Sequence, residues 1–587
     1  MANEVSAHVR RLNEYLPLDA GSSVLFQEYV DPDDHPSIRT RALSYLEEVV
    51  GREDGQLRLI VLTGDAGHGK THICAKLLEG LDYSAATAST AIKEKCDGSR
   101  DLAALVDGRK LRIVKDLSEL TVAEGARVLA GALAAERRLT IVCANEGRLR
   151  SALAHDREAL GAVVRSLEQG LAEGRLDVDP QVVVLNLNFQ SVASPGNRLA
   201  VELLRWAVDG RKWRVCSGCD SRDVCPILEN RRLLADRRRG PARIDAIESL
   251  LQTAERIGAV ITVRELLMFV AYGLTGGIAC SDVHRRARRT DWQSDYEFTQ
   301  NLFGDRLTTS QRLSLRSLRY LRLIDPGAVA FRAVDDDLVP EASDEEGRFL
   351  PRESAIGNAA VTTRAQAKSA AEAARVLFRF MRRRAYFTSV AAAGPLLKPL
   401  GFTFGNDFLA IVTGDLAPSE SRRLRDQMIA GVEAVQGLRR SGEGRHLLLV
   451  DPAFSSGLAS TSIVARRIPI TDVEIRSQSA AWDRKLGHEA ELPQSLDWSD
   501  RAVVIELRDR EDVYPIQIDL LTFEYLMRAG EGLDGRAFFD AEVRRLAGAI
   551  APLVRGSSDD DQIEIVRDGR LEGLVIDTGD VIRKVVD

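Results

Sequence analysis

The chain lacks any apolar run that approaches the roughly 20 residues of a membrane-spanning helix. Its first residues, MANEVSAHVRRLNEYLP, carry charges and have no apolar core, which excludes a signal peptide. Cysteine is also scarce, at 7 in 587 residues. Without a secretory signal, this number favours a reducing cytoplasm over a disulfide framework. We therefore expect a cytoplasmic protein that makes no use of a membrane.

The chain also lacks an excess of positive charge. Its net charge of −7 excludes a protein that binds nucleic acid through overall charge, but clusters of arginine can bind phosphate locally. The alternative is that these arginines lie on solvated helix faces and pair with the many acids. No helix-turn-helix, zinc finger, aromatic-basic platform or nuclease motif is present. The clusters are Arg231-Arg232, Arg237–Arg239, Arg285-Arg286-Arg288-Arg289 and Arg382–Arg384.

The length exceeds one compact core and predicts roughly three or four domains. Charged residues are 28% and apolar residues 45%, which is the ordinary globular range. We expect a helical leader over 1–50, a P-loop core over 51–240 and a helical lid over 241–345. A Cys-rich insertion interrupts the core near 213–230. After an acidic linker, EASDEEGRFLPRESAIGN, residues 346–587 are expected to form an α+β domain in which no catalytic constellation is recognised.

The stretch LIVLTGDAGHGKTHICA carries the pattern G-x-x-x-x-G-K-[ST], between an expected strand over 57–63 and an expected helix over 70–81. Glycine allows the tight turn that points backbone N–H groups at a diphosphate, and the helix adds its positive N-terminal end. Lys70 would reach the β- and γ-phosphates of ATP, and the Thr71 hydroxyl would ligate Mg²⁺. The expected nucleotide-binding residues are Gly64, Asp65, Ala66, Gly67, His68, Gly69, Lys70, Thr71 and His72.

An acid follows the next short β-rich run, over 111–114. Asp116 stands where a Walker B carboxylate would hold Mg²⁺, at the tip of a strand that we expect beside the P-loop strand. Glu119, three residues on, is a candidate to polarise the attacking water. The alternative is that Asp116 caps the following helix and Glu119 is a first-turn acid of that helix.

A third strand, over 139–143, ends in Asn145 and Glu146. An amide at this place is where AAA+ ATPases keep the residue called sensor 1, so Asn145 is expected to contact the γ-phosphate. Glu146 competes with Glu119 as the catalytic base. The alternative is an ordinary Asn-Glu-Gly turn.

A fourth strand, within 182–194, is apolar enough to be buried on both faces. The alternation of strands and helices predicts a doubly wound parallel sheet. In the lid, Arg264 is either a second sensor or an exposed first-turn arginine. An arginine finger from a neighbouring subunit is expected, which implies a homo-oligomer; the candidates are Arg148, Arg150 and Arg157.

Three cysteines stand in the pattern C-x₂-C-x₅-C: Cys216, Cys219 and Cys225. Thiolates at this spacing can bind one Zn²⁺, which needs a fourth ligand. Cys280 is the best fourth ligand and His284 the next, provided that the lid folds back over the insertion. The alternative is a set of reduced thiols in a surface loop.

The order of GDAGHGKT, KDLSEL, CANEGRL, LNLNFQSV, C-x₂-C-x₅-CP with Asn230 soon after, and LIDP resembles the DptF-like P-loop ATPases of DNA phosphorothioation-dependent restriction. The resemblance covers about 50–335 in motif order. It implies an ATPase subunit of a bacterial defence complex that acts on DNA with partner subunits. By position it also implies nucleotide binding at Gly64, Gly69, Lys70 and Thr71, Mg²⁺ at Asp116 and γ-phosphate sensing at Asn145.

Three function classes fit these motifs. The first is an AAA+-like ATPase that couples ATP hydrolysis to assembly or movement on DNA in a restriction or phage-defence complex. The second is a nucleotide-gated scaffold with little hydrolysis, which the missing adjacent Asp-Glu pair favours. The third is a small-molecule kinase, against which the long C-terminal part and the missing acceptor-site signature argue.

Overall fold

The computed structural model describes the chain in segments. These are residues 5–18, 39–52, 55–93, 101–105, 107–289, 292–330, 335, 349, 364–389, 397–438, 444–450, 461–509, 512–533, 535, 538–554, 562–567, 570–577 and 580–585. Most of the predicted acidic linker, and Cys96, lie outside the described residues.

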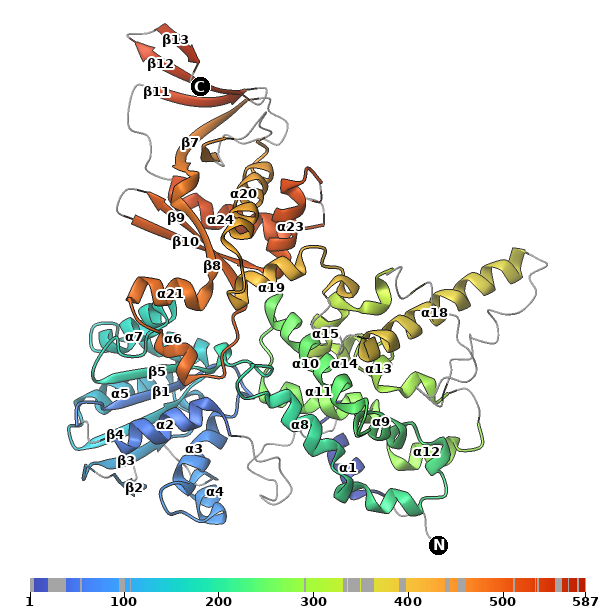
Figure 1. Cartoon of the computed structure of the whole chain (residues 1–587). Helices are drawn as coiled ribbons and strands as arrows, with labels where there is room; N and C mark the ends of the chain where they lie inside the picture. Colours follow the sequence, from blue (N-terminus) through green and yellow to red (C-terminus); the bar gives the residue numbers. More distant parts are fainter. Residues whose placement is uncertain are drawn as a thin grey trace. The chain divides into compact units, whose positions relative to one another are not determined.

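The chain forms two compact units (Figure 1). The first comprises Met1–Glu255, Ala259–Gly401 and Glu489–Ser499, and the second comprises Arg256–Gly258, Phe402–His488 and Asp500–Asp587. The division therefore falls after Gly401, whereas the sequence predicts a boundary near residue 346. Helix α18 (Arg364–Ser389) belongs to the first unit because its C-terminal half packs there, with Phe387 against Phe298 at 5.5 Å between ring centroids.

A five-stranded sheet forms the core of the first unit, in the order β2-β3-β4-β1-β5. Four strands are parallel, and the two-residue β2 pairs antiparallel with β3, so the sheet is mixed where an all-parallel sheet was predicted. Strand β1 pairs with β4 and β5, and β3 pairs with β4. The strands are β1 (Leu59–Thr63), β2 (Ala103–Ala104), β3 (Lys110–Val114), β4 (Arg138–Cys143) and β5 (Val182–Asn186).

Helices cover both faces of this sheet, as the predicted doubly wound arrangement requires. On one face, α5 (Val122–Ala134), α6 (Glu146–His155) and α7 (Gly161–Glu173) pack against alternate strand residues, including Val61 and Val184. The other face holds α3 (Lys70–Glu79), against which α2 (Arg41–Gly51) and α4 (Ala85–Lys93) pack. Burial on both faces explains why β1 and β5 are apolar along their whole length.

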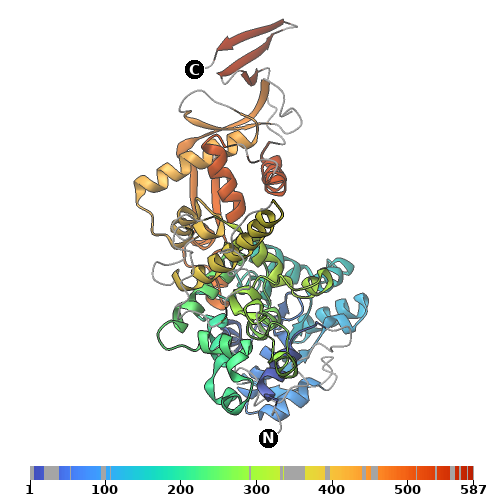
Figure 2. The same ribbon diagram turned by 90° about the vertical axis from the view of Figure 1, so that its right-hand side faces the viewer.

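The rest of the first unit is a helical layer. The lid predicted over 241–345 contributes α10 to α15, and α1, α8, α9 and α18 from outside that range also belong to the layer. Its central helix is α11, which contacts α1, α8, α9, α13 and α15. Figure 2 shows the yellow helix α18 against the green helices of this layer. The helices are α1 (Ala7–Glu14), α8 (Leu199–Val208), α9 (Pro226–Leu234), α10 (Gly240–Arg256), α11 (Val263–Thr275), α12 (Cys280–Arg286), α13 (Phe298–Asn301), α14 (Thr309–Ser314), α15 (Arg316–Leu321) and α18.

One segment of this layer, Val263–Arg286, has the length and composition of a membrane span, with a mean hydropathy of 1.5 in its most apolar window. It is the one such segment among the described residues. The protein itself buries 61% of that window, and the segment consists of α11, a turn and α12. Its apolar character is therefore that of a core helix, which contacts five neighbours.

The second unit is α+β, as predicted for the C-terminal part. It contains two antiparallel sheets, β10-β9-β8 and β13-β12-β11-β7-β6. Gly431 of α20 lies so close to α23 that a Cβ atom there would stand 2.1 Å from the Leu526 carbonyl oxygen. The elements are α19 (Gly405–Thr413), α20 (Pro418–Val435), β6 (His446–Val450), β7 (Thr461–Pro469), β8 (Val473–Ser477), α21 (Gln478–Leu486), β9 (Ala502–Asp509), β10 (Asp512–Asp519), α23 (Leu520–Gly530), α24 (Asp540–Val554), β11 (Gln562–Arg567), β12 (Arg570–Asp577) and β13 (Asp580–Val585).

A short piece of the C-terminal part, Glu489–Ser499, belongs to the first unit and is called the return segment below. Its helix α22 (Glu491–Ser495) packs on α2, and the Leu492 N–H donates to the Gly174 carbonyl at 2.9 Å. The Asp497 carbonyl accepts a hydrogen bond from the Ser191 N–H at 2.6 Å. The chain thus leaves the first unit after Gly401 and comes back to it near the end of β5.

Candidate functional site

The loop between β1 and α3 has the backbone of a phosphate-binding turn. Gly64, Gly67 and Gly69 have φ angles of 128°, 105° and 81°, a region that side-chain-bearing residues rarely adopt. Gly69 is the N-cap of α3, so Lys70 and Thr71 begin the helix as the motif requires. The remaining predicted loop residues differ in exposure, with Asp65 and Ala66 exposed, His68 buried and His72 half-buried. Backbone N–H groups and the helix N-terminus together suit an anion.

Lys70 points into this loop. Its Nζ donates to the carbonyl oxygens of Gly64 at 2.7 Å and Asp65 at 2.9 Å, and to Asn145 Oδ1 at 3.3 Å. Burial lowers the pKa of Lys70, while the nearby charges of Asp116 and Asp65 oppose this shift and Arg264 adds to it. Asp116 and Arg264 are therefore each within electrostatic reach of Lys70.

Asn145 follows β4 and is the N-cap residue of α6, yet its side chain makes no cap hydrogen bond. It accepts instead from Lys70. The carboxyl ends of parallel strands lie at one edge of a sheet, so β4 brings Asn145 beside the loop that follows β1. The side chain therefore faces the loop, and its expected contact with a γ-phosphate stays a prediction.

Asp116 follows β3 at the same edge of the sheet. The prediction that its strand is next to the P-loop strand is wrong, because β4 lies between β1 and β3. Asp116 Oδ1 accepts from the Ser118 N–H at 2.8 Å and from the Ser118 hydroxyl at 2.7 Å, which caps the turn η3 (Leu117–Glu119). Asp116 therefore caps η3 and also lies within electrostatic reach of Lys70. It does not cap the following helix α5, whose N-cap residue is Thr121.

The two candidate bases lie in different environments. Glu119 is exposed at the end of η3. Glu146 is half-buried, and its Oε2 accepts from Asn186 Nδ2 at 3.1 Å and Asn188 Nδ2 at 3.2 Å, while its Oε1 accepts from Arg150. Burial alone would raise the pKa of Glu146, but the hydrogen bonds from Arg150, Asn186 and Asn188 outweigh it and keep the pKa below its ordinary value. Glu146 is thus a fixed carboxylate.

Asn188 also contacts the loop itself. Its Oδ1 accepts from the Asp65 N–H at 2.8 Å, and a Cβ at Gly64 would stand 3.2 Å from the same oxygen. Asn186 and Asn188 are functional candidates that the sequence analysis did not identify as site residues. The available signal was two asparagines directly after a fully buried strand, in LNLNF.

The first turn of α11 lies against the loop. The Arg264 N–H donates to the Gly67 carbonyl at 3.1 Å, and a Cβ at Gly67 would stand 2.9 Å from both Arg264 Cβ and Thr262 Oγ1. Thr262 and Glu265 form a reciprocal capping box that fixes this turn. Arg264 is half-buried and its charge acts on Lys70, so it is not a simple exposed arginine; a role as second sensor stays a prediction.

The three arginine-finger candidates differ in exposure. Arg148 Nη2 donates to the Leu120 carbonyl and Arg150 pairs with Glu146 at 2.8 Å, so both are held within the unit. Arg157 is 75% exposed and lies 3.9 Å from Glu168. Arg157 is the most exposed of the three, although Arg150 is also 52% exposed.

The Arg382–Arg384 cluster is not a phosphate-binding surface. Arg383 is buried between Asp325 and Asp305, at 2.6 Å and 2.8 Å, and Arg384 is buried against Glu297. Arg382 pairs with Asp335 at 2.7 Å. These arginines therefore join α18 to the helical layer. Exposed members of the other clusters, including Arg237, Arg238, Arg288 and Arg289, stay available for phosphate.

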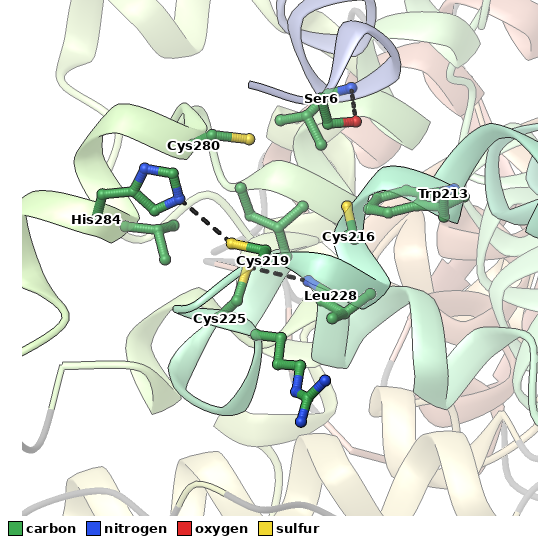
Figure 3. A pocket seen from close by; sticks show the side chains of 12 residues that line it. Ser6, Trp213, Cys216, Cys219, Cys225, Leu228, Cys280 and His284 are labelled. Carbon is green, nitrogen blue, oxygen red and sulfur yellow. Dashed lines mark hydrogen bonds between the residues drawn. The ribbon is translucent and has the colours of Figure 1, made fainter. Parts of the chain in front are cut away.

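The four predicted zinc ligands come together. Cys216, Cys219, Cys225 and Cys280 line one cavity with His284 (Figure 3). Helices α11 and α12 return Cys280 to the Cys-rich segment, which meets the requirement stated for the lid. As the side chains stand, no three His, Cys, Asp or Glu residues in the described part of the chain are arranged to hold a metal ion.

Asn230, which belongs to the sequence pattern, has a structural place. It is buried, and its side chain donates to the Leu274 and Tyr296 carbonyls and accepts from the Phe298 N–H. It therefore joins α9, α11 and α13 and makes no contact with the loop between β1 and α3 among those described above.

Comparisons with family models, with curated proteins and with solved structures find no significant match.

Proposed function

We propose that this protein is an AAA+-like P-loop ATPase that hydrolyses ATP with Mg²⁺. The observation that carries the proposal is the convergence at one edge of the sheet. There, a glycine loop with three left-handed glycines holds Lys70, and Lys70 in turn contacts Asn145 and lies within electrostatic reach of Asp116. The strand bearing Asn145 lies between the P-loop strand and the strand bearing Asp116, so the acid and the amide can face one bound phosphate chain.

Each residue has a role that its position supports. The loop N–H groups and Lys70 would hold the β- and γ-phosphates, and Thr71 and Asp116 would hold Mg²⁺, which neutralises charge on the transferred phosphoryl group. Asn145 would contact the γ-phosphate. Arg264 would add a second positive charge from α11, since it already lies within electrostatic reach of Lys70.

Glu146 is the better supported of the two bases. A carboxylate that orients water must be ionised and fixed, and the hydrogen bonds from Asn186, Asn188 and Arg150 make it so. Glu119 is exposed and has no comparable partners among the described side chains. Because Asn188 also accepts from the loop at Asp65, Glu146 and the loop share a hydrogen-bonded neighbour.

The biological setting of the proposal comes from the sequence resemblance. We place the ATPase in the cytoplasm, as a subunit of a bacterial DNA restriction or anti-phage defence complex in which hydrolysis is coupled to assembly or movement on DNA. A homo-oligomer would supply Arg157 of one subunit to the nucleotide of the next. The partners are other subunits of that complex, with DNA bound directly or through them.

One observation favours the alternative of a nucleotide-gated scaffold. Asp116 is followed by Leu117 in place of an adjacent acid, and the next carboxylate, Glu119, is exposed, so the Walker B position itself supplies no fixed base. In that function, ATP binding recruits partners and hydrolysis has little part.

Phosphate release from ATP, measured with and without duplex DNA, separates these functions. The ATPase predicts turnover that DNA or partner subunits stimulate, and the scaffold predicts tight binding with negligible release under both conditions. Phosphate transfer to a metabolite in place of water would identify a kinase. Absence of ATP binding would contradict all three.

A further inference from the structure

The cysteine cavity lies in the helical layer, and three segments of the chain enclose it. The Cys-rich segment contributes Cys216, Cys219 and Cys225, the start of α12 contributes Cys280 and His284, and the N-terminal segment contributes Ser6. Figure 3 shows the sulfur atoms and the His284 ring around one space. The cavity measures ≈ 20 Å³, just above the volume that one water-sized sphere needs, so a single ion has room there.

The four thiols share one cavity and come from two parts of the chain. Apart from the four cysteines, His284, Ser6 and Arg222, the lining is apolar, with Val9, Trp213, Ile227, Leu228 and Val283. Four thiolates gathered in such surroundings are stable only beside a strong cation.

Hydrogen-bond donors already surround the sulfur atoms. The Leu228 N–H donates to Cys225 Sγ at 3.4 Å, where Cys225 caps the start of α9. Ser6 forms a hydrogen bond with Cys216 through its side chain and with Cys280 through its backbone. His284 Nε2 lies 3.4 Å from Cys219 Sγ. Such donors orient metal-bound sulfur and offset its negative charge.

We propose that this cluster is a structural Zn²⁺ site in which Cys216, Cys219, Cys225 and Cys280 are the four ligands, and His284 donates a hydrogen bond to the Cys219 sulfur. Thiolate donors select Zn²⁺ among the available divalent ions, and four protein ligands leave no open position for catalysis. Binding requires the thiol side chains to turn toward the centre of the cavity. It converts Zn²⁺ and four neutral thiols into a tetrathiolate complex of charge −2 and releases four protons to water.

The site would hold the far end of α11. That helix begins against the nucleotide loop at Thr262 and ends at Thr275, and at 1.5 Å per residue its 13 residues span about 20 Å. Cys280 follows its end by five residues. The metal would therefore fix the helix whose first turn contacts Gly67, and would join α1, α9 and α12 at its other end. This inference does not depend on the reaction proposed above.

Metal analysis of the purified full-length protein tests the proposal. We expect one zinc per chain, and all 7 thiols titratable after denaturation with a chelator. Protein without zinc that takes up none from solution, or a denatured chain with fewer titratable thiols because disulfides have formed, would overturn it. Replacing Zn²⁺ by Co²⁺ in the wild-type protein then reads the ligand set from the d–d absorption bands, without a variant that must fold. Four thiolates support the proposal, and three thiolates with one imidazole contradict it.

Substitutions distinguish the proposed zinc ligands from His284, the proposed hydrogen-bond donor. Cys225→Ser and Cys280→Ser should each lose most of the zinc and lower the melting temperature, whereas His284→Ala should keep close to one zinc per chain and release it faster to a chelator. Cys74→Ala is the matched control, because that buried thiol pairs with Cys143 in the sheet core and should leave the zinc content unchanged. Full zinc in Cys280→Ser together with loss in His284→Ala would overturn the assignment of both residues.

Discussion

Glu146 is the side chain on which the proposed chemistry depends most. It accepts hydrogen bonds from two asparagines after β5, one of which also accepts from the nucleotide loop. A bound triphosphate would draw the loop N–H groups toward its oxygens. The hydrogen bond from the Asp65 N–H to Asn188 Oδ1 would then change. Asn188 thus links the loop to the carboxylate that we propose as the catalytic base.

Glu146→Gln should bind ATP with nearly unchanged affinity and lose turnover by about 100-fold or more, because the amide cannot take the proton of the attacking water. Glu119→Gln is the matched control, since Glu119 is exposed, and it should keep wild-type turnover. The measurement is steady-state phosphate release with ATP binding measured in parallel. Loss of turnover in Glu119→Gln with normal turnover in Glu146→Gln would reverse the assignment.

For single residues, the sequence predicts the positions that the neighbouring stretch of chain determines. The glycines of the loop, Lys70 and Asn145 follow from one motif and one strand end. The sequence does not decide between Glu119 and Glu146 as the catalytic base, because the exposure of each side chain depends on packing against distant segments. Asn188 could not be assigned from sequence, since its two partners, Glu146 and Asp65, lie 42 and 123 residues away along the chain.

Helix α18 shows how an element can be misjudged from composition. Its Arg382–Arg384 run suggests phosphate binding, yet Arg383 is 1% exposed and makes a two-pronged pair with Asp325, and its guanidinium lies 4.4 Å from the Phe303 ring centroid. A run of arginines cannot reveal this, because the acids that pair with Arg383 are Asp305 and Asp325, the N-cap residue of the turn η9 (Pro326–Ala328), and both lie more than 50 residues earlier in the chain.

Arg383→Ala should destabilise the helical layer by about 3–5 kcal/mol, because it leaves buried carboxylates without their cation. The control is Arg379→Ala, one turn earlier on the same helix. The Arg379 side chain lies near the same two acids but is 43% exposed, so its loss should lower the free energy of unfolding by about 1 kcal/mol or less. Urea unfolding of both variants measures the difference. Equal costs for the two substitutions would contradict a buried pair at Arg383.

The return segment is a second element with a measurable signature. Asp497 is fully buried, and its Oδ2 accepts from the Arg41 N–H at 3.3 Å. Burial raises the pKa of Asp497 from 3.8 to about 6, although hydrogen bonds from Arg41 and Asn197 oppose the shift. The folded protein therefore binds this proton more tightly than the unfolded chain does. The contribution of Asp497 to stability is fully present below about pH 4 and is lost as the pH rises through about 6.

Asp497→Asn removes this dependence and keeps a side-chain oxygen for the Arg41 N–H. The variant should be more stable than the wild type at pH 7, by an amount of the order of 2 kcal/mol, and the gain should shrink as the pH falls to 4. Melting temperatures of both proteins across this range give the result. Parallel pH profiles would show that Asp497 is not held with a raised pKa.

The order of the strands was only partly predictable from the sequence. The runs predicted over 57–63, 111–114, 139–143 and 182–194 each contain a strand, because each holds an apolar run short enough to cross a buried sheet, but β1 begins at Leu59 and β5 ends at Asn186. Their neighbours in the sheet depend on where the helices between them pack. The insertion of β4 between β1 and β3 is therefore a property of the fold that the residues of β3 do not encode locally.

At the scale of the whole molecule, the chain makes two compact units whose boundary follows contacts more than composition. The acidic segment near residue 346 suggested a boundary, but α18 beyond it packs back onto the helical layer through Phe387 and its arginines. Glu489–Ser499 likewise returns to the first unit through single hydrogen bonds, such as Leu492 to Gly174, that leave no periodic signal in the sequence. Long-range returns of this kind limit domain prediction from one sequence.

The most direct test of the account is calorimetric titration of the full-length protein with Mg²⁺-ATP. We expect one ATP to bind per chain, and Lys70→Ala to bind at least about tenfold more weakly, because a charge-assisted hydrogen bond is worth roughly 1.5–3 kcal/mol. Lys76→Ala is the matched control on the same helix, since Lys76 pairs with Glu79 at 2.8 Å and should bind as the wild type does. Wild-type affinity in Lys70→Ala, or no binding of ATP by the wild-type protein, would contradict the account.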